Sequence, residues 1–180
     1  MPVAIARFSP ADAAPIESLR ERRLWRGAAS DRGKALEIGL VNNMPDAAMA
    51  ATERQFVDLL AAASGGFDVR LHLYALGEVP RSPEARAALA RNYRDARHIR
   101  TTRLDALIIT GAEPVARELA LEPYWRSLTE LIDWADSQTF STILSCLAAH
   151  AGVQHLDGIA RQPLSTKCSG IYAFKTTESY

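Results

Sequence analysis

Cysteine is scarce in this chain of 180 residues, which has only two, Cys146 and Cys168. Two cysteines are too few for the disulfide framework of a small secreted domain, and they suit a reducing compartment better. They also lack a zinc-ligand spacing such as Cys-x-x-Cys, so the sequence predicts no metal site. We therefore expect a cytoplasmic protein.

An excess of charge of one sign is lacking as well, because Lys+Arg and Asp+Glu both total 21. A nucleic-acid-binding surface or an electrostatic membrane anchor requires an excess of basic residues. No apolar run reaches the roughly 18 residues of a membrane span. Residues 1–16 have no basic region followed by an apolar core, which a secretory signal would show. We expect neither a nucleic acid nor a membrane as a partner.

The length allows one domain with a sizeable hydrophobic core. Residues 1–34 mix Pro and Ala with many arginines, and we interpret them as an N-terminal leader or surface extension. We expect this segment to lie on the surface or to cover another subunit, which leaves a homodimer open. Residues 35–180 form the expected α/β domain.

Apolar strand patterns alternate with helical patterns through that domain. Buried or half-buried strands are predicted at residues 35–41, 67–74, 104–110 and 140–144, with the second near the sheet edge and His72 on its solvent side. Helices are predicted from Asp46 as the N-cap to residue 63, from Pro83 after the cap Ser82, from Pro123, and after Cys146. This alternation indicates a doubly wound, mostly parallel sheet with helices on both faces.

Three segments fall at the carboxyl ends of the predicted strands, where such sheets place their ligand sites. They are Asn42-Asn43-Met44, Gly111-Ala112 and Cys146-Leu147. A glycine directly after a parallel strand lets the backbone turn and approach a ligand closely. Their convergence favours a functional role for Cys146 over that of a small buried apolar residue, which most free cysteines have.

Cys146 lies at a corner between a short strand and a run of small residues that favours a helix. A cysteine there meets free backbone N–H groups and the positive end of the helix dipole, and both stabilise a thiolate. Because the thiolate is the nucleophilic form, Cys146 is the candidate nucleophile.

Short sequence blocks extend in one order from Leu36 to Tyr172. They are IGLVNNMP (38–45), ERQF (53–56), LIITGA (107–112), YW (124–125), ST (141–142), Cys146, GI (158–159) and KxSGIY (167–172). No single block is specific, but together they resemble the homoserine O-succinyltransferase and homoserine O-acetyltransferase family. The resemblance implies a class I glutamine-amidotransferase-like fold with flavodoxin-like layering.

The resemblance also implies an activity, the transfer of a succinyl or acetyl group from acyl-CoA to the hydroxyl of L-homoserine in methionine biosynthesis. Acyl-CoA is then a co-substrate, and no bound cofactor is implied. Cys146 matches the acyl-thioester nucleophile and Lys167 a substrate-binding lysine, although without the resemblance Lys167 would be an ordinary exposed lysine. Backbone N–H groups near Leu147 and in the Gly111-Ala112 turn would hold the oxyanion.

Two departures from the family pattern affect these expectations. Val115 stands at the acyl-donor-selecting position in place of glycine or glutamate, which leaves succinyl and acetyl open. The family's base is a histidine followed two residues later by glutamate, after the Lys167 block, and this chain has no such pair. We therefore expect the front half of a longer enzyme, with an under-covered edge or apolar patch near residue 180. His150 and His155 are expected to serve packing or surface roles.

Two alternatives to the acyltransferase remain at this level. One is a non-catalytic amidotransferase-like binding domain that has lost the base. The other is a glutamine amidohydrolase, a class that shares the cysteine corner.

Overall fold

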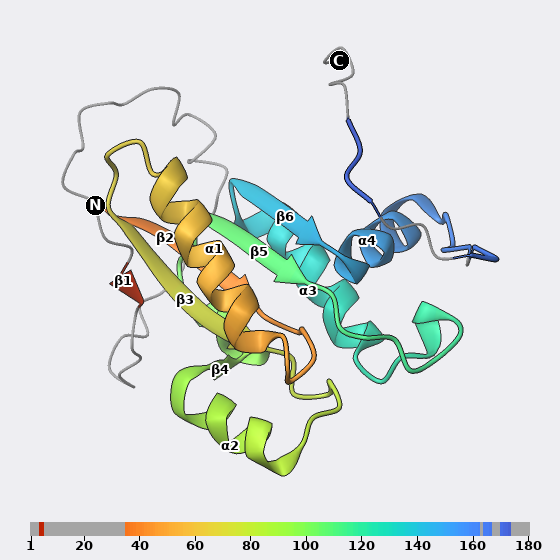
Figure 1. Ribbon diagram of the computed structural model, residues 1–180. Coiled ribbons are helices and arrows are strands. Elements are labelled where there is room, and N and C mark those ends of the chain that lie inside the picture. The colour runs from red at the N-terminus through yellow and green to blue at the C-terminus, as the bar shows by residue number, and fades with distance from the viewer. Residues whose placement is uncertain (1–3, 6–34, 163, 167–169, 174–180) are drawn as a thin grey trace.

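The computed structural model describes residues 4–5, 35–162, 164–166 and 170–173 (Figure 1). Most of the predicted leader, together with Lys167 and Cys168, therefore lies outside the described residues. The strands are β1 (Ala4–Ile5), β2 (Leu36–Val41), β3 (Val69–Ala75), β4 (Arg94–Asp95), β5 (Ala106–Thr110) and β6 (Ser141–Ser145). The α-helices are α1 (Met49–Ala63), α2 (Pro83–Asn92), α3 (Trp125–Gln138) and α4 (Leu147–Asp157), with short 3-10 helices η2 (Ala96–Thr101) and η3 (Leu119–Leu121).

The strands form one sheet in the order β1-β3-β2-β5-β6, with β4 pairing with the end of β3, and every pair is parallel. Parallel neighbours need crossover connections, and α1 and α3 provide crossovers on opposite faces of the sheet (Figure 1). The predicted doubly wound α/β architecture is confirmed. Strand β3 lies next to the sheet edge, as its alternating pattern predicted.

Two apolar clusters show how the sheet is covered on both faces. On one face, Ile38, Leu40 and Ile108 pack against Phe56 and Leu60 of α1. On the other face, alternate strand residues pack against α3 and α4, in a cluster that includes Val41, Leu107, Ile109, Leu128, Ile132 and Ala148. The central strand β5 is therefore buried on both sides, which explains its continuous run of apolar residues.

The helix after β2 begins later than predicted. Helix α1 starts at Met49, and its N-cap residue Ala48 makes no side-chain capping bond. Asp46, the predicted cap, instead accepts hydrogen bonds from Arg81 Nη1 at 3.1 Å and from the Ser82 amide at 2.9 Å. The guanidinium of Arg81 is a charged donor, and its hydrogen bond to the Asp46 carboxylate is stronger than one from a backbone amide of a helix N-terminus. The prediction that Asp46 caps α1 is therefore wrong. The second cap is confirmed, since Ser82 Oγ accepts from the Ala85 amide at 3.1 Å.

Two polar residues, His72 and Glu53, have partners in the fold, and His72 was predicted on the solvent side of its strand. His72 contacts Glu37 at 2.5 Å across the neighbouring strands β3 and β2, and Glu53 of α1 accepts from the Tyr93 hydroxyl at 2.6 Å. His72 lies on the less buried face of β3, but its side chain is only 15% exposed, and the sequence pattern could not reveal its partner. One strand prediction also needs correction, because β3 starts at Val69, two residues after the exposed Phe67.

Strand β6 lies at an edge of the described sheet (Figure 1). Ile143 of this strand is 55% exposed, and Phe140, which directly precedes the strand, is 72% exposed. Val153, Leu156 and Ile159 extend this apolar surface over α4 and the segment after it. This surface belongs to residues 140–159, whereas the region near residue 180, where an under-covered edge or apolar patch was expected, lies largely outside the described residues. Within the described residues, no helix is long and apolar enough to span a bilayer.

Candidate active site

Cys146 occupies the single residue between strand β6 and helix α4. Its backbone has φ 59° and ψ −131°, and among the described residues it is the only non-glycine with a positive φ. This conformation costs a non-glycine residue about 1–3 kcal/mol and persists only where the surrounding structure imposes it. The turn leaves the Cys146 side chain exposed, beside the N–H groups of the first turn of α4, which have no intrahelical partner.

Gly111 brings the end of β5 into direct contact with this corner. A Cβ atom on Gly111 would lie 2.5 Å from the Leu147 amide nitrogen and 2.7 Å from the Leu147 Cα. The Gly111 amide donates to the Ser145 carbonyl at 3.0 Å, so it is already used. In the described part of the chain the Ala112 amide donates no hydrogen bond, and Leu147 is the first residue of its helix. These two N–H groups are the candidates for an oxyanion hole.

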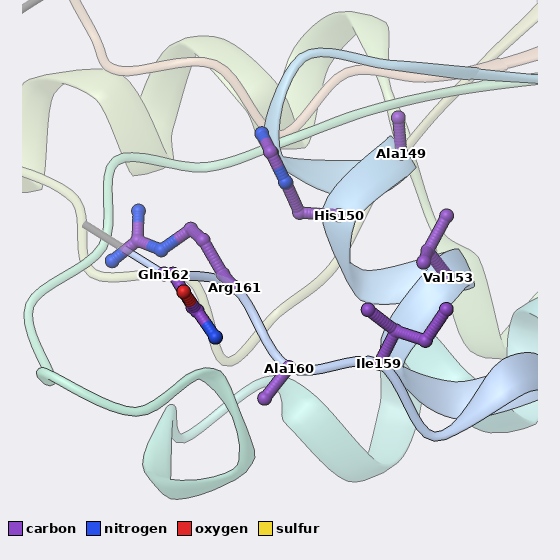
Figure 2. A pocket seen from close by; sticks show the side chains of 7 residues that line it. All are labelled: Ala149, His150, Val153, Ile159, Ala160, Arg161 and Gln162. Carbon is purple, nitrogen blue, oxygen red and sulfur yellow. The ribbon is translucent and has the colours of Figure 1, made fainter. Parts of the chain in front are cut away.

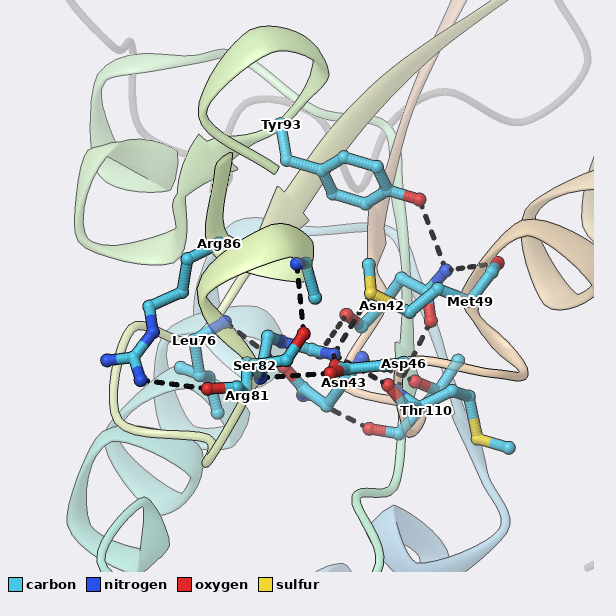
Figure 3. A network of polar contacts seen from close by, with 12 residues as sticks. Asn42, Asn43, Asp46, Met49, Leu76, Arg81, Ser82, Arg86, Tyr93 and Thr110 are labelled. Carbon is cyan, nitrogen blue, oxygen red and sulfur yellow. Dashed lines mark hydrogen bonds and ion pairs between the residues drawn. The ribbon is translucent and has the colours of Figure 1, made fainter. Parts of the chain in front are cut away.

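Asn43 joins the ends of three strands (Figure 3). Its amide donates to Thr110 Oγ1 at 2.7 Å, and its Nδ2 donates to the Thr110 carbonyl at 3.1 Å. Its Oδ1 accepts from the Leu76 amide, after β3, at 3.1 Å. Because Thr110 directly precedes Gly111, the segments after β2, β5 and β6 meet at one end of the sheet. The predicted convergence of these segments is confirmed.

Arg81 holds the loop that follows β2, and sequence reasoning missed it. Its side chain is 2% exposed and donates to the carbonyls of Asn42 at 3.2 Å and Met44 at 2.9 Å, besides Asp46 (Figure 3). Hydrogen bonds from the Ser82 amide and from Arg81 hold the pKa of Asp46 below its usual value. The one sequence signal for this role was an arginine in a turn between two prolines.

Replacement of Arg81 by methionine is expected to lower the free energy of unfolding by about 2–4 kcal/mol. The substitution keeps the length of the side chain but leaves the two buried carbonyls without their donor. Urea denaturation followed by circular dichroism measures the change. Arg91→Met, on the exposed side of α2, is the control and should stay within about 0.5 kcal/mol. Equal losses in the two variants would show that Arg81 does not anchor the loop.

The donor-selecting position expected at Val115 lies in an exposed loop between β5 and η3. The Val115 side chain is 77% exposed, and its amide donates to Glu122 Oε1 at 2.6 Å. The loop begins directly after Gly111-Ala112, and Gly111 is the residue that approaches Leu147 closely. Lys167 is not among the described residues, and its role stays a prediction.

The two histidines of α4 differ in their surroundings. His155 contacts Asp133 of α3 at 2.7 Å, which ties the two helices together. His150 is exposed and lines an open hollow of about 460 Å³ (Figure 2). Arg161 and Gln162, after α4, line the same hollow together with apolar side chains. Within the described ranges, no three His, Cys, Asp or Glu side chains are grouped so that they could hold a metal ion.

Comparison with known proteins places this geometry in a family. The family model for homoserine O-succinyltransferase matches residues 16–180. A homoserine O-succinyltransferase of Rhodopseudomonas palustris is 58% identical over 144 residues, which are 80% of this chain and 43% of that protein. Those of Methylorubrum extorquens and Bradyrhizobium japonicum are 52% and 50% identical, over 78% and 76% of this chain and 41% and 42% of theirs. The chain spans less than half the length of these relatives, and it belongs to the homoserine O-succinyltransferase family.

Proposed function

We propose that this chain carries the nucleophile of a homoserine O-acyltransferase that moves a succinyl group from succinyl-CoA to the hydroxyl of L-homoserine. The observation that carries the proposal is the Cys146 corner, where an exposed cysteine with a strained backbone directly precedes Leu147, the residue that Gly111 approaches closely. Strain of this kind clusters at active sites. The names of the relatives support succinyl over acetyl as the donor.

In the first half-reaction, Cys146 Sγ attacks the carbonyl carbon of the thioester and forms a new C–S bond. The carbonyl oxygen gains a negative charge, which the amides of Ala112 and Leu147 stabilise by donating hydrogen bonds. Collapse of this intermediate breaks the bond to coenzyme A, which leaves as a thiolate. The product is a succinyl thioester on Cys146.

In the second half-reaction, the homoserine hydroxyl attacks the acyl-thioester while a base accepts its proton. The Cys146 thiolate then leaves, and the ester O-succinylhomoserine is released. By resemblance, the base is the histidine of the family's His-x-Glu pair, after the Lys167 block. Lys167 suits the homoserine carboxylate, because an ammonium group acts as a compact point charge.

Separate assays of the two half-reactions test the proposal. Incubation with succinyl-CoA or acetyl-CoA should release free coenzyme A and add one acyl mass to the chain, faster with succinyl-CoA. In an assay of residues 1–180 alone, addition of homoserine should then give turnover at least about 100-fold slower than that of the Rhodopseudomonas palustris relative, because these residues contain no His-x-Glu pair.

Two other outcomes would contradict the proposal. Turnover at the rate of the relative would show that residues 1–180 already supply a base for the homoserine hydroxyl. His150 and His155 would then become the residues to mutate first. Ammonia release from glutamine, with no acyl mass from either thioester, would instead support a glutamine amidohydrolase. Acylation by neither thioester and no ammonia release would support a binding domain.

A further inference from the structure

Glu122 is a buried carboxylate in the loop that leads from η3 to α3. Only 4% of the residue is exposed. Its Oε1 accepts hydrogen bonds from the backbone amides of Val115 and Ala116, both at 2.6 Å. Its Oε2 has no hydrogen-bond partner among the described residues. Burial of a carboxylate costs free energy unless hydrogen bonds or an opposite charge compensate the loss of water. In the described structure, the two backbone amides are the main compensation for Glu122.

Tyr124 adds a second buried polar group beside Glu122. Its hydroxyl also lacks a hydrogen-bond partner in the described part of the chain. Burial, and next the nearby negative charge of Glu122, raises the pKa of Tyr124 to about 12. The phenol therefore remains protonated at neutral pH and cannot supply a second charge. The hydrogen bonds to Glu122 Oε1 are thus the side-chain contacts that hold this loop in the described structure.

The two amides held by Glu122 belong to the loop that carries the expected donor-selecting residue. Val115 is exposed, so few packing contacts restrain its side chain. The position of Val115 is therefore determined by its backbone, and the Glu122 carboxylate restrains that backbone on two consecutive residues. Two charge-assisted hydrogen bonds to one oxygen are stronger than bonds to a neutral acceptor.

We propose that Glu122 is a positioning residue for acyl-donor choice, which holds the backbone of Val115 and Ala116 where the acyl chain of the CoA thioester passes Cys146. The inference rests on the proposed function and on the match of Val115 to the donor-selecting position. Glu122 does not contact the reacting atoms. A purely structural role predicts lower stability on its removal, whereas a positioning role also predicts a changed preference between donors.

The test measures the ratio of Cys146 acylation rates with succinyl-CoA and acetyl-CoA, by intact mass, in four variants. Glu122→Ala removes the acceptor and should lower the succinyl-to-acetyl ratio about tenfold, since pocket contacts of this kind discriminate by factors of this size. Glu122→Asp keeps the charge but withdraws the oxygen by one methylene, and it should also lower the ratio. Glu122→Gln keeps an acceptor oxygen and should stay within about threefold of the parent chain. Glu118→Gln, an exposed carboxylate of the same loop, should leave the ratio unchanged.

An unchanged ratio in a folded Glu122→Ala or Glu122→Asp variant would overturn the inference and leave the proposed function intact. If Glu122→Ala does not fold, as judged by circular dichroism, Glu122→Asp decides between the two roles. Absence of acylation in the parent chain with either donor would overturn the proposed function and this inference with it.

Discussion

Replacement of Cys146 by serine is expected to reduce acylation of the chain by succinyl-CoA at least about 100-fold. Serine is nearly isosteric with cysteine, so the corner between β6 and α4 should keep its shape. A hydroxyl is far less ionised than a thiol at neutral pH, and among the described residues no base is hydrogen-bonded to the side chain at this position to compensate. Intact-mass measurement of the protein after incubation with succinyl-CoA, followed by peptide mapping, detects the change.

Cys168→Ser provides the matched control, because Cys168 is the only other cysteine of the sequence. This variant should be acylated at the rate of the parent chain. An acyl group found on Cys168, or on neither cysteine of a folded chain, would contradict the assignment of Cys146 as the nucleophile.

The sheet could be predicted from the sequence because its signals are local. The run Leu107-Ile108-Ile109 fills a strand that is buried on both faces, and the Ser82-Pro83 pair starts α2 where capping chemistry predicts. Each of these features depends on a residue and its near neighbours in sequence. The placement of helices between the strands then follows from the crossovers that parallel strands require, whereas the strand order was not predicted.

The polar partners could not be predicted, because they come from distant parts of the chain. Arg81 and Asp46 are 35 residues apart, and Glu53 and Tyr93 are 40 apart. Asp46 satisfies the local rule for a helix cap, but the arginine provides a stronger partner once the chain has folded. Glu122 lies in a connector with no periodic pattern, so nothing local marked it as buried.

The structure brings the three predicted segments together, but the role of one glycine differs from the expectation. Gly111 was expected to bring the backbone close to a ligand. Its missing Cβ instead makes room for the backbone of Leu147, and its amide bonds to Ser145. The positive φ of Cys146 was likewise beyond sequence reasoning, which associates that conformation with glycine.

Replacement of Gly111 by alanine is therefore expected to disrupt the site itself. The new Cβ would meet the amide nitrogen and Cα of Leu147 at 2.5 and 2.7 Å, distances that real Cβ contacts do not show. These are backbone atoms at the start of α4, so relief requires a shift of the helix N-terminus together with Cys146. We expect acylation by succinyl-CoA to fall about 100-fold, because small displacements of reacting groups have effects of this size. The free energy of unfolding should fall by about 1–3 kcal/mol through overpacking.

Gly152→Ala separates this effect from simple crowding. Its Cβ would also overlap a neighbour, but that neighbour is Cδ1 of Leu144, the end of a flexible side chain. Leu144 can change rotamer, and alanine is the better helix former in α4 by about 1 kcal/mol. Gly152→Ala should therefore keep acylation within about threefold of the parent chain. Acylation of a folded Gly111→Ala chain at the parent rate would show that the close Gly111–Leu147 contact does not position the nucleophile.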